Sequence, residues 1–153
     1  MRIAALATAF SLLSAGVLAQ EFDQVNLDEL NYCLGEIGYK GSSDPWDCVG
    51  FIAAFCRQGV ADASDQAAIV CLNREKSVWQ AVLEEQMASL RSKMEPSAFA
   101  RLAEQRSASP ASHAEHCEAQ GETSVATARC LRDMMARRAL FVQFYAADLA
   151  DAP

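Results

Sequence analysis

Six cysteines spread along helix-like sequence constrain this chain more than any other feature. They are Cys33, Cys48, Cys56, Cys71, Cys117 and Cys130. An even set of six can form three disulfides, which persist outside the cytosol and rarely inside it. The cysteines therefore predict a protein that folds in an oxidising compartment, with structural bridges rather than free catalytic thiols.

The N-terminus predicts the same compartment, because it reads as an export signal. A basic start precedes an apolar run over 3–13, and small residues before Gln20 fit a cleavage site after Ala19. The run is too short to span a membrane, and the first cysteine, Cys33, lies too far from the cleavage site to carry a lipid anchor. We therefore predict a signal peptide over 1–19 and a periplasmic or secreted protein with no membrane anchor.

The remaining 20–153 has the size of one ordinary domain. The formal net charge of the chain is −7, and loss of Arg2 with the signal peptide takes it to −8. An acidic surface repels nucleic acid and anionic lipid and attracts cationic partners. Moderate acidity also serves solubility alone, and that alternative stays open. Nothing in the sequence fixes the oligomeric state.

Apolar residues recur at helical spacing between start and stop signals, and we find no alternating strand pattern of useful length. The predicted starts lie at Asn26, Asp44, Ser64, Pro96, Pro110 and Thr123, and predicted stops at Gly38, Gly59 and Gly121. The third and last helices carry apolar seams, formed by Leu72, Trp79, Leu83 and Leu90, and by Leu131, Met135, Val142, Tyr145 and Leu149. These signals predict an all-α fold of antiparallel helical hairpins or a small bundle, stapled by disulfides.

The cysteine spacing predicts how the bridges pair. Each successive pair is almost symmetric about a predicted helix-helix turn, and residues equidistant from such a turn face one another. The pairs predicted in this way are Cys33 with Cys48, Cys56 with Cys71, and Cys117 with Cys130. Six cysteines allow fifteen connectivities, so the sequence favours this pairing without excluding the others.

Two charged residues interrupt the apolar seams. Glu75 lies between Leu72 and Trp79 in the third helix, and Arg138 lies within the seam of the last one. Either charge alone would lose hydration without compensation, so we predict a partly buried ion pair between Glu75 and Arg138 that keeps the two helices in register. The alternative is that each extends its charged end into water from a helix edge.

Catalytic and cofactor chemistry has little support in the residue pattern. His113 and His116 stand three residues apart next to Cys117, but a zinc site needs further ligands and this cysteine is better explained by a bridge. Glu84 and Glu85 are adjacent and point to different parts of a helix surface, so they do not form an acid-base pair. We therefore expect no enzyme, no catalytic residue, no metal and no cofactor.

A family resemblance rests on short motifs. They are Cys71-Leu72-Asn73-Arg74-Glu75, Trp79, Leu83, Leu90, Leu102, Gln105-Arg106, Cys117, Cys130-Leu131 and Arg138. With them, the stretch 71–140 resembles the domain family named after the lysozyme inhibitor LprI. An upstream set is similar to the extra cysteine segment of exported alphaproteobacterial members: Cys33-Leu34, Trp46, Cys48-Val49-Gly50, Ala53 and Cys56. Within one helical domain, 20–65 is thus an N-terminal cysteine segment and 66–150 an LprI-like region.

The chain departs from the family pattern at several polar positions. Gln80 stands where the family has Asp, Glu84 and Met87 where it has Asn and Tyr, and Met135 where it has Thr. The stretch 107–113 replaces further polar elements and contains a proline inside what is a continuous helix elsewhere. These changes keep the scaffold and replace much of the family's polar surface, so a binding function that rests on those polar groups is not expected to carry over unchanged.

For function, the resemblance implies an exported, helical binding protein stapled by disulfides. It implies inhibition of a cationic lysozyme, whose cleft the acidic protein would occlude after electrostatic steering. The alternative is a structural or assembly role in the cell envelope with an unidentified protein partner. The sequence itself names no partner-binding residues.

Overall fold

The computed structural model describes residues 17–36, 44–59, 61, 63–106, 110–120 and 123–150 of the chain. Every regular element in these ranges is helical, as predicted. In chain order the elements are α1 (Val17–Glu36), the 3-10 helix η1 (Pro45–Cys48), α2 (Phe51–Gln58), α3 (Asp65–Lys93), α4 (Pro96–Arg106), α5 (Pro110–Gln120) and α6 (Ser124–Ala150). The fold is therefore all-α over the described part of the chain.

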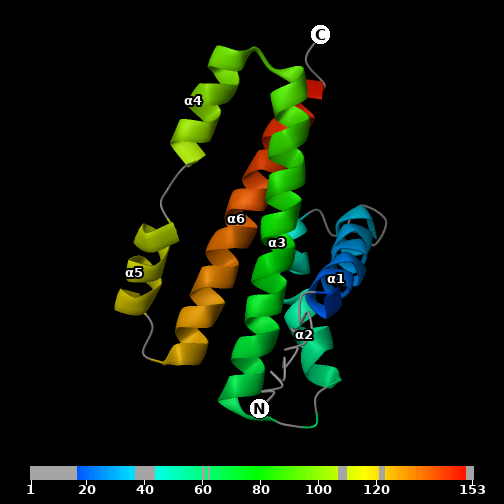
Figure 1. Cartoon of the computed structure of the whole chain (residues 1–153), viewed down its shortest axis with the longest axis vertical. Coiled ribbons are helices and arrows are strands. Elements are labelled where there is room, and N and C mark those ends of the chain that lie inside the picture. Colours follow the sequence, from blue (N-terminus) through cyan, green and yellow to red (C-terminus); the bar gives the residue numbers. More distant parts are fainter. Residues whose placement is uncertain are drawn as a thin grey trace, which may run out of the picture.

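Two long helices form the axis of the molecule. α3 and α6 lie side by side and run in the same direction (Figure 1). α4 and α5 connect the end of α3 to the start of α6 and lie outside this pair. On the opposite side of α3, α1 and α2 pack against its first half. None of the described helices is both long and apolar enough to cross a membrane.

Three of the six predicted helix starts are confirmed by capping hydrogen bonds. The side chain of Asp44 accepts from the Trp46 amide at 2.9 Å, and that of Ser64 accepts from the Ala67 amide at 3.2 Å. Thr123 likewise accepts from the amide of Ala126 at 3.1 Å. Each side-chain oxygen satisfies an amide that has no partner within its own helix.

The predicted start at Asn26 is wrong. α1 already begins at Val17, and Asn26 is buried inside it. No glycine or proline stands between Val17 and Leu34, so nothing in the local sequence stops the helix from extending upstream. Most of the predicted signal peptide, 1–16, lies outside the described residues, and so does the predicted stop at Gly38.

The second predicted helix is divided into two. It begins as η1, which ends at Cys48, and resumes as α2 after Gly50. Gly50 has φ +100°, a left-handed conformation that residues with a Cβ rarely adopt. Gly59 ends α2, as predicted.

The three disulfides confirm the predicted pairing. Cys33–Cys48 joins α1 to η1, Cys56–Cys71 joins α2 to α3, and Cys117–Cys130 joins α5 to α6, with Cα–Cα distances of 6.0, 5.6 and 5.6 Å. Each closes a loop of roughly 15 residues, worth about 3 kcal/mol in the chain-entropy model. These bonds agree with folding in an oxidising environment outside the cytosol.

The central core brings α1, η1 and α2 against α3 and α6. Its buried members are Leu30, Cys48, Ile52, Val78, Trp79, Val82, Ala136, Ala139 and Leu140. Of the predicted seams, Trp79, Leu90 and Val142 are fully buried, whereas Leu149 is 43% exposed. The face of α6 that meets α3 is thus rich in alanine, and small side chains let two helices approach closely.

Candidate functional site

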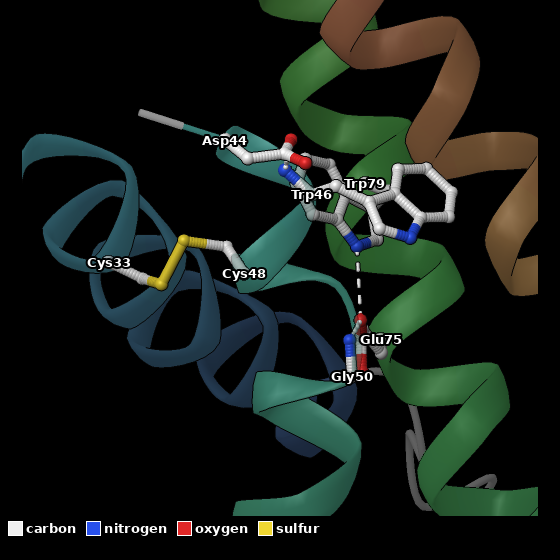
Figure 2. Close-up of a disulfide and its surroundings, with 7 residues drawn as sticks. All are labelled: Cys33, Asp44, Trp46, Cys48, Gly50, Glu75 and Trp79. Atoms are coloured by element: carbon white, nitrogen blue, oxygen red, sulfur yellow. Dashed lines mark hydrogen bonds between the residues drawn. A yellow bond between two sulfur atoms is a disulfide. The ribbon is translucent and has the colours of Figure 1, made fainter. Parts of the chain in front are cut away.

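A buried carboxylate at the start of α2 fixes this part of the molecule. Glu75 of α3 has no exposed surface, and its Oε1 accepts from the Gly50 amide at 2.6 Å and from the Trp79 indole at 3.1 Å. Its Oε2 accepts from the Ala53 amide at 2.9 Å. Figure 2 shows Glu75 facing Gly50, with the indole nitrogen above it. A carboxylate in this position complements the positive end of the α2 dipole.

The predicted ion pair between Glu75 and Arg138 is wrong in its cation. Arg132 of α6 supplies it instead, with its Nη1 at 3.4 Å from Oε2 of Glu75. Arg132 is itself buried, and its Nε also donates to Asp133 at 2.7 Å. A Cβ at position 50 would lie 3.3 Å from the same Nη1, so glycine at position 50 leaves room for this guanidinium. We call these groups the Glu75 junction.

An open groove lies on the outer side of α1 and α2. The residues that line it are Val25, Asp28, Glu29, Tyr32, Phe51 and Phe55, around a volume of about 430 Å³. We call it the α1–α2 groove. The apolar and aromatic lining residues are strongly exposed: Val25 to 59%, Tyr32 to 63%, Phe51 to 40% and Phe55 to 56%. Large apolar side chains gathered at a surface in this way mark interaction sites in soluble proteins.

Local sequence explains how the groove forms. Val25, Asp28, Glu29 and Tyr32 stand at spacings of three and four, so they share one face of α1, while Phe51 and Phe55 share one face of α2. The opposite face of α2 carries Ile52, Ala53 and Cys56, which are buried against the core. The aromatic pair is therefore turned outward by the same packing that buries its neighbours.

Two disulfides hold the walls of the groove. Cys33–Cys48 ties α1 to the turn that leads into α2 (Figure 2), and Cys56–Cys71 ties α2 to α3. Leu30 of α1 and Ile52 of α2 pack into the shared core beneath it. Since both helices are fixed on the same core, the groove is formed before any partner arrives.

The charge of the groove is negative. Asp28 and Glu29 are its two charged lining residues. Glu29 is partly buried, and its Oε2 is covered yet has no hydrogen-bond donor among the described residues. Buried polar atoms are paired in the large majority of cases, so this oxygen contrasts with those of Glu75.

Arg138 lies in a second hollow, of about 490 Å³, between α3, α5 and α6. His113 of α5 lines the same hollow, which also includes Gln80 and Glu84 of α3. Burial lowers the pKa of His113 below its usual value, and the positive charges of Arg138 and His116 lower it further. The hollow is thus lined by groups of both signs, with no excess of acid.

His113 and His116, considered above as metal ligands, do not belong to a metal-binding group among the described residues. No group of three histidine, cysteine or acidic side chains among them could hold an ion. Cys117 is bonded to Cys130, which leaves His113 and His116 without it as a ligand. Glu84 accepts a hydrogen bond from Gln80 at 2.9 Å on the exposed face of α3, and Glu85 is also exposed.

The sequence interpretation missed both Arg132 and the α1–α2 groove. A signal for the groove exists in the spacing of Phe51 and Phe55, which occupy the face of α2 opposite Ala53 and Cys56. Comparison with protein-family models, with curated proteins and with solved structures finds no match to this chain.

Proposed function

We propose that the chain is an exported, non-enzymatic binding protein that docks a cationic protein partner at the α1–α2 groove. One observation carries the proposal: four exposed apolar side chains and two carboxylates line the same preformed surface. Aromatic anchors with a charged rim are the usual composition of protein interfaces.

Charge supports a cationic partner. The net charge of −7 gives the protein a field that attracts positively charged proteins at a distance. Asp28 and Glu29 repeat that sign inside the groove. Steering would then bring the partner to a surface that also complements it on contact.

Rigidity supports it as well. The Glu75 junction and two disulfides fix α2 and α1 on α3. A surface that is already ordered loses little conformational entropy on binding, so more of the contact energy remains as affinity.

Lysozyme is the partner that we propose to test first. The resemblance of 71–140 to the LprI family supports this choice, as does the basic character of c-type lysozymes. Bound through the α1–α2 groove, the protein would cover the cleft of lysozyme and exclude the lysozyme substrate. In this proposal the protein acts in the periplasm or outside the cell, where the disulfides are stable.

A second apolar face favours an assembly role in the cell envelope as the alternative. Phe141, Phe144 and Leu149 are all more than 40% exposed and stand on one side of α6. Such a face suits a second protein contact, which an assembly factor needs and an inhibitor does not. In that case a deletion strain becomes sensitive to detergent, while lysozyme is unaffected by the purified protein.

The direct test is a lysozyme turbidity assay with the oxidised protein. We expect inhibition at micromolar concentration, stronger at low salt than at physiological salt. Phe55→Ser should weaken inhibition, whereas Val70→Ser, which removes an exposed apolar side chain of α3 outside the groove, should not. An absence of inhibition removes lysozyme as the partner. Equal inhibition by both variants removes the groove as the site.

A further inference from the structure

We propose that the α1–α2 groove recognises an arginine side chain of its partner, with Glu29 as the group that binds the guanidinium. The inference rests on the proposed docking function and names the chemistry of that same site. The groove has a volume of about 430 Å³, which lies at the small end of the range for ligand sites, so the proposal concerns a single side chain of the partner.

The apolar walls suit the stem of such a side chain. Tyr32, Phe51 and Phe55 offer aromatic surface from two helices, and Val25 extends it along α1. Arginine buries its methylene groups along apolar surface while its charged end reaches a polar partner. The aromatic faces also attract the guanidinium itself.

The covered oxygen of Glu29 supplies the polar partner. Its Oε2 is covered and has no donor among the described residues, and the Glu29 side chain belongs to the lining of the open groove. The terminal torsion of a glutamate side chain is broad, so a modest rotation presents either oxygen to the groove. A charge-assisted hydrogen bond from a guanidinium would satisfy it.

The charge of the lining favours a cationic occupant. Of the six lining residues two are acidic and four are uncharged, so the described lining of the groove carries no positive charge. Asp28 is exposed beside Glu29 and adds a second negative charge at the rim. A divalent metal is a poor occupant, because calcium takes about six to eight oxygen ligands and the groove offers two carboxylates.

Arginine fits better than lysine because of the aromatic surface. A planar guanidinium stacks on rings and pairs with a carboxylate through two parallel bonds, whereas an ammonium acts as a point charge. The chain uses this stacking elsewhere: the guanidinium of Arg137 lies 5.1 Å from the centre of the Trp46 ring, and that of Arg91 lies 5.1 Å from the Phe99 ring.

The test uses two short peptides and the full oxidised protein. One is acetyl-Leu-Arg-Leu-amide, and the other replaces arginine by citrulline, which keeps the shape and removes the charge. Nitrogen-15 NMR titrations should show shifts confined to 25–32 and 51–55 with the arginine peptide, and binding about tenfold weaker with the citrulline peptide. Equal binding of the two peptides, or no shifts in these ranges, overturns the proposal.

Glu29→Gln is the matched variant, because it keeps the side chain's size and removes its charge. It should lower the affinity for the arginine peptide about tenfold. Glu118 is an exposed acid on α5, and Glu118→Gln should leave this affinity unchanged. An unchanged affinity in Glu29→Gln overturns the role of Glu29. Near-ultraviolet circular dichroism of both variants checks that the fold is kept.

The proposal and the docking function can fail separately. If Phe55→Ser abolishes lysozyme inhibition and Glu29→Gln does not, the docking function stands and the arginine anchor is wrong. If the arginine peptide binds and lysozyme is not inhibited, the anchor stands and lysozyme is the wrong partner.

Discussion

Two glutamates, Glu75 in the core and Glu29 in the groove, show how the same side chain serves different ends. Glu75 is fully buried and accepts four hydrogen bonds, from two backbone amides, an indole and a guanidinium. Glu29 is partly buried and has one covered oxygen without a donor in the described residues. Within the described part of the chain, both oxygens of the first carboxylate are thus paired, whereas one oxygen of the second is not.

The surroundings of the two carboxylates differ in the same sense. Around Glu75 the aromatic neighbour, Trp79, is buried and donates to it. Around Glu29 the aromatic neighbours, among them Tyr32 and Phe55, face outward. A completed polar network stabilises a fold, whereas an incomplete one beside exposed apolar surface suits a partner. The predictions below separate these two roles by their effect on stability.

The largest expected effect is that of Glu75→Ala. It leaves the Arg132 guanidinium without its buried partner and leaves the amides of Gly50 and Ala53 without acceptors. Removing one member of a buried ion pair costs about 3–5 kcal/mol. Urea unfolding of the oxidised protein should show a loss of this size. A loss below about 1 kcal/mol would mean that water replaces the carboxylate and that the junction is not a stabilising network.

Next in size is removal of the Cys56–Cys71 disulfide by replacing both cysteines with alanine. This bridge holds α2 against α3 beside the Glu75 junction. We expect the free energy of unfolding to fall by about 3 kcal/mol, because the unfolded chain gains the freedom of a loop of roughly 15 residues. Thermal and urea unfolding measure it, with the intact protein under identical conditions as control. An unchanged stability would show that the packing of α2 alone fixes its position.

The cation of the junction shows where sequence reasoning succeeded and where it failed. The helix starts at Ser64 and Thr123 and the disulfide pairs were predictable, because a cap acts within three residues and each bridge spans one turn. Glu75 was predictable as a buried charge from its position on an apolar seam. Its partner on α6 was not, because that depends on how α6 is rotated about its own axis.

The rotation of α6 is set by small residues that carry little hydrophobic signal. The predicted seam followed large side chains such as Met135 and Tyr145, which are only partly buried and pack against the edge of the core clusters. Ala136 and Ala139 are fully buried instead, and they stand on the same face as Arg132. Close approach at the alanines turns Arg132 inward and Arg138 toward α5. Steric fit between two helices, absent from a single-helix pattern, therefore selects the ion pair.

A double-mutant cycle in urea tests this choice of partner. Glu75→Gln and Arg132→Met should couple by at least about 1 kcal/mol, because the two groups are in contact and both are buried. Glu75→Gln and Arg138→Met serve as the control cycle and should be additive within about 0.5 kcal/mol. The reverse result would restore Arg138 as the partner and would contradict the 3.4 Å contact of Arg132.

The smallest expected effect on stability is that of Glu29→Ala, and it sharpens the comparison most. This substitution removes a covered oxygen that has no donor among the described residues, so no network is lost with it. The free energy of unfolding should change by no more than about 0.5 kcal/mol. Any change should make the variant the more stable protein, since an unsatisfied buried acceptor costs energy in the folded state.

Binding of the arginine peptide should fall in the same variant. Urea unfolding and the NMR titration measure the two quantities side by side. A residue that supports binding and not folding gives this combination. A stability loss comparable to that of Glu75→Ala would instead make Glu29 a second structural carboxylate and remove the distinction between the two sites.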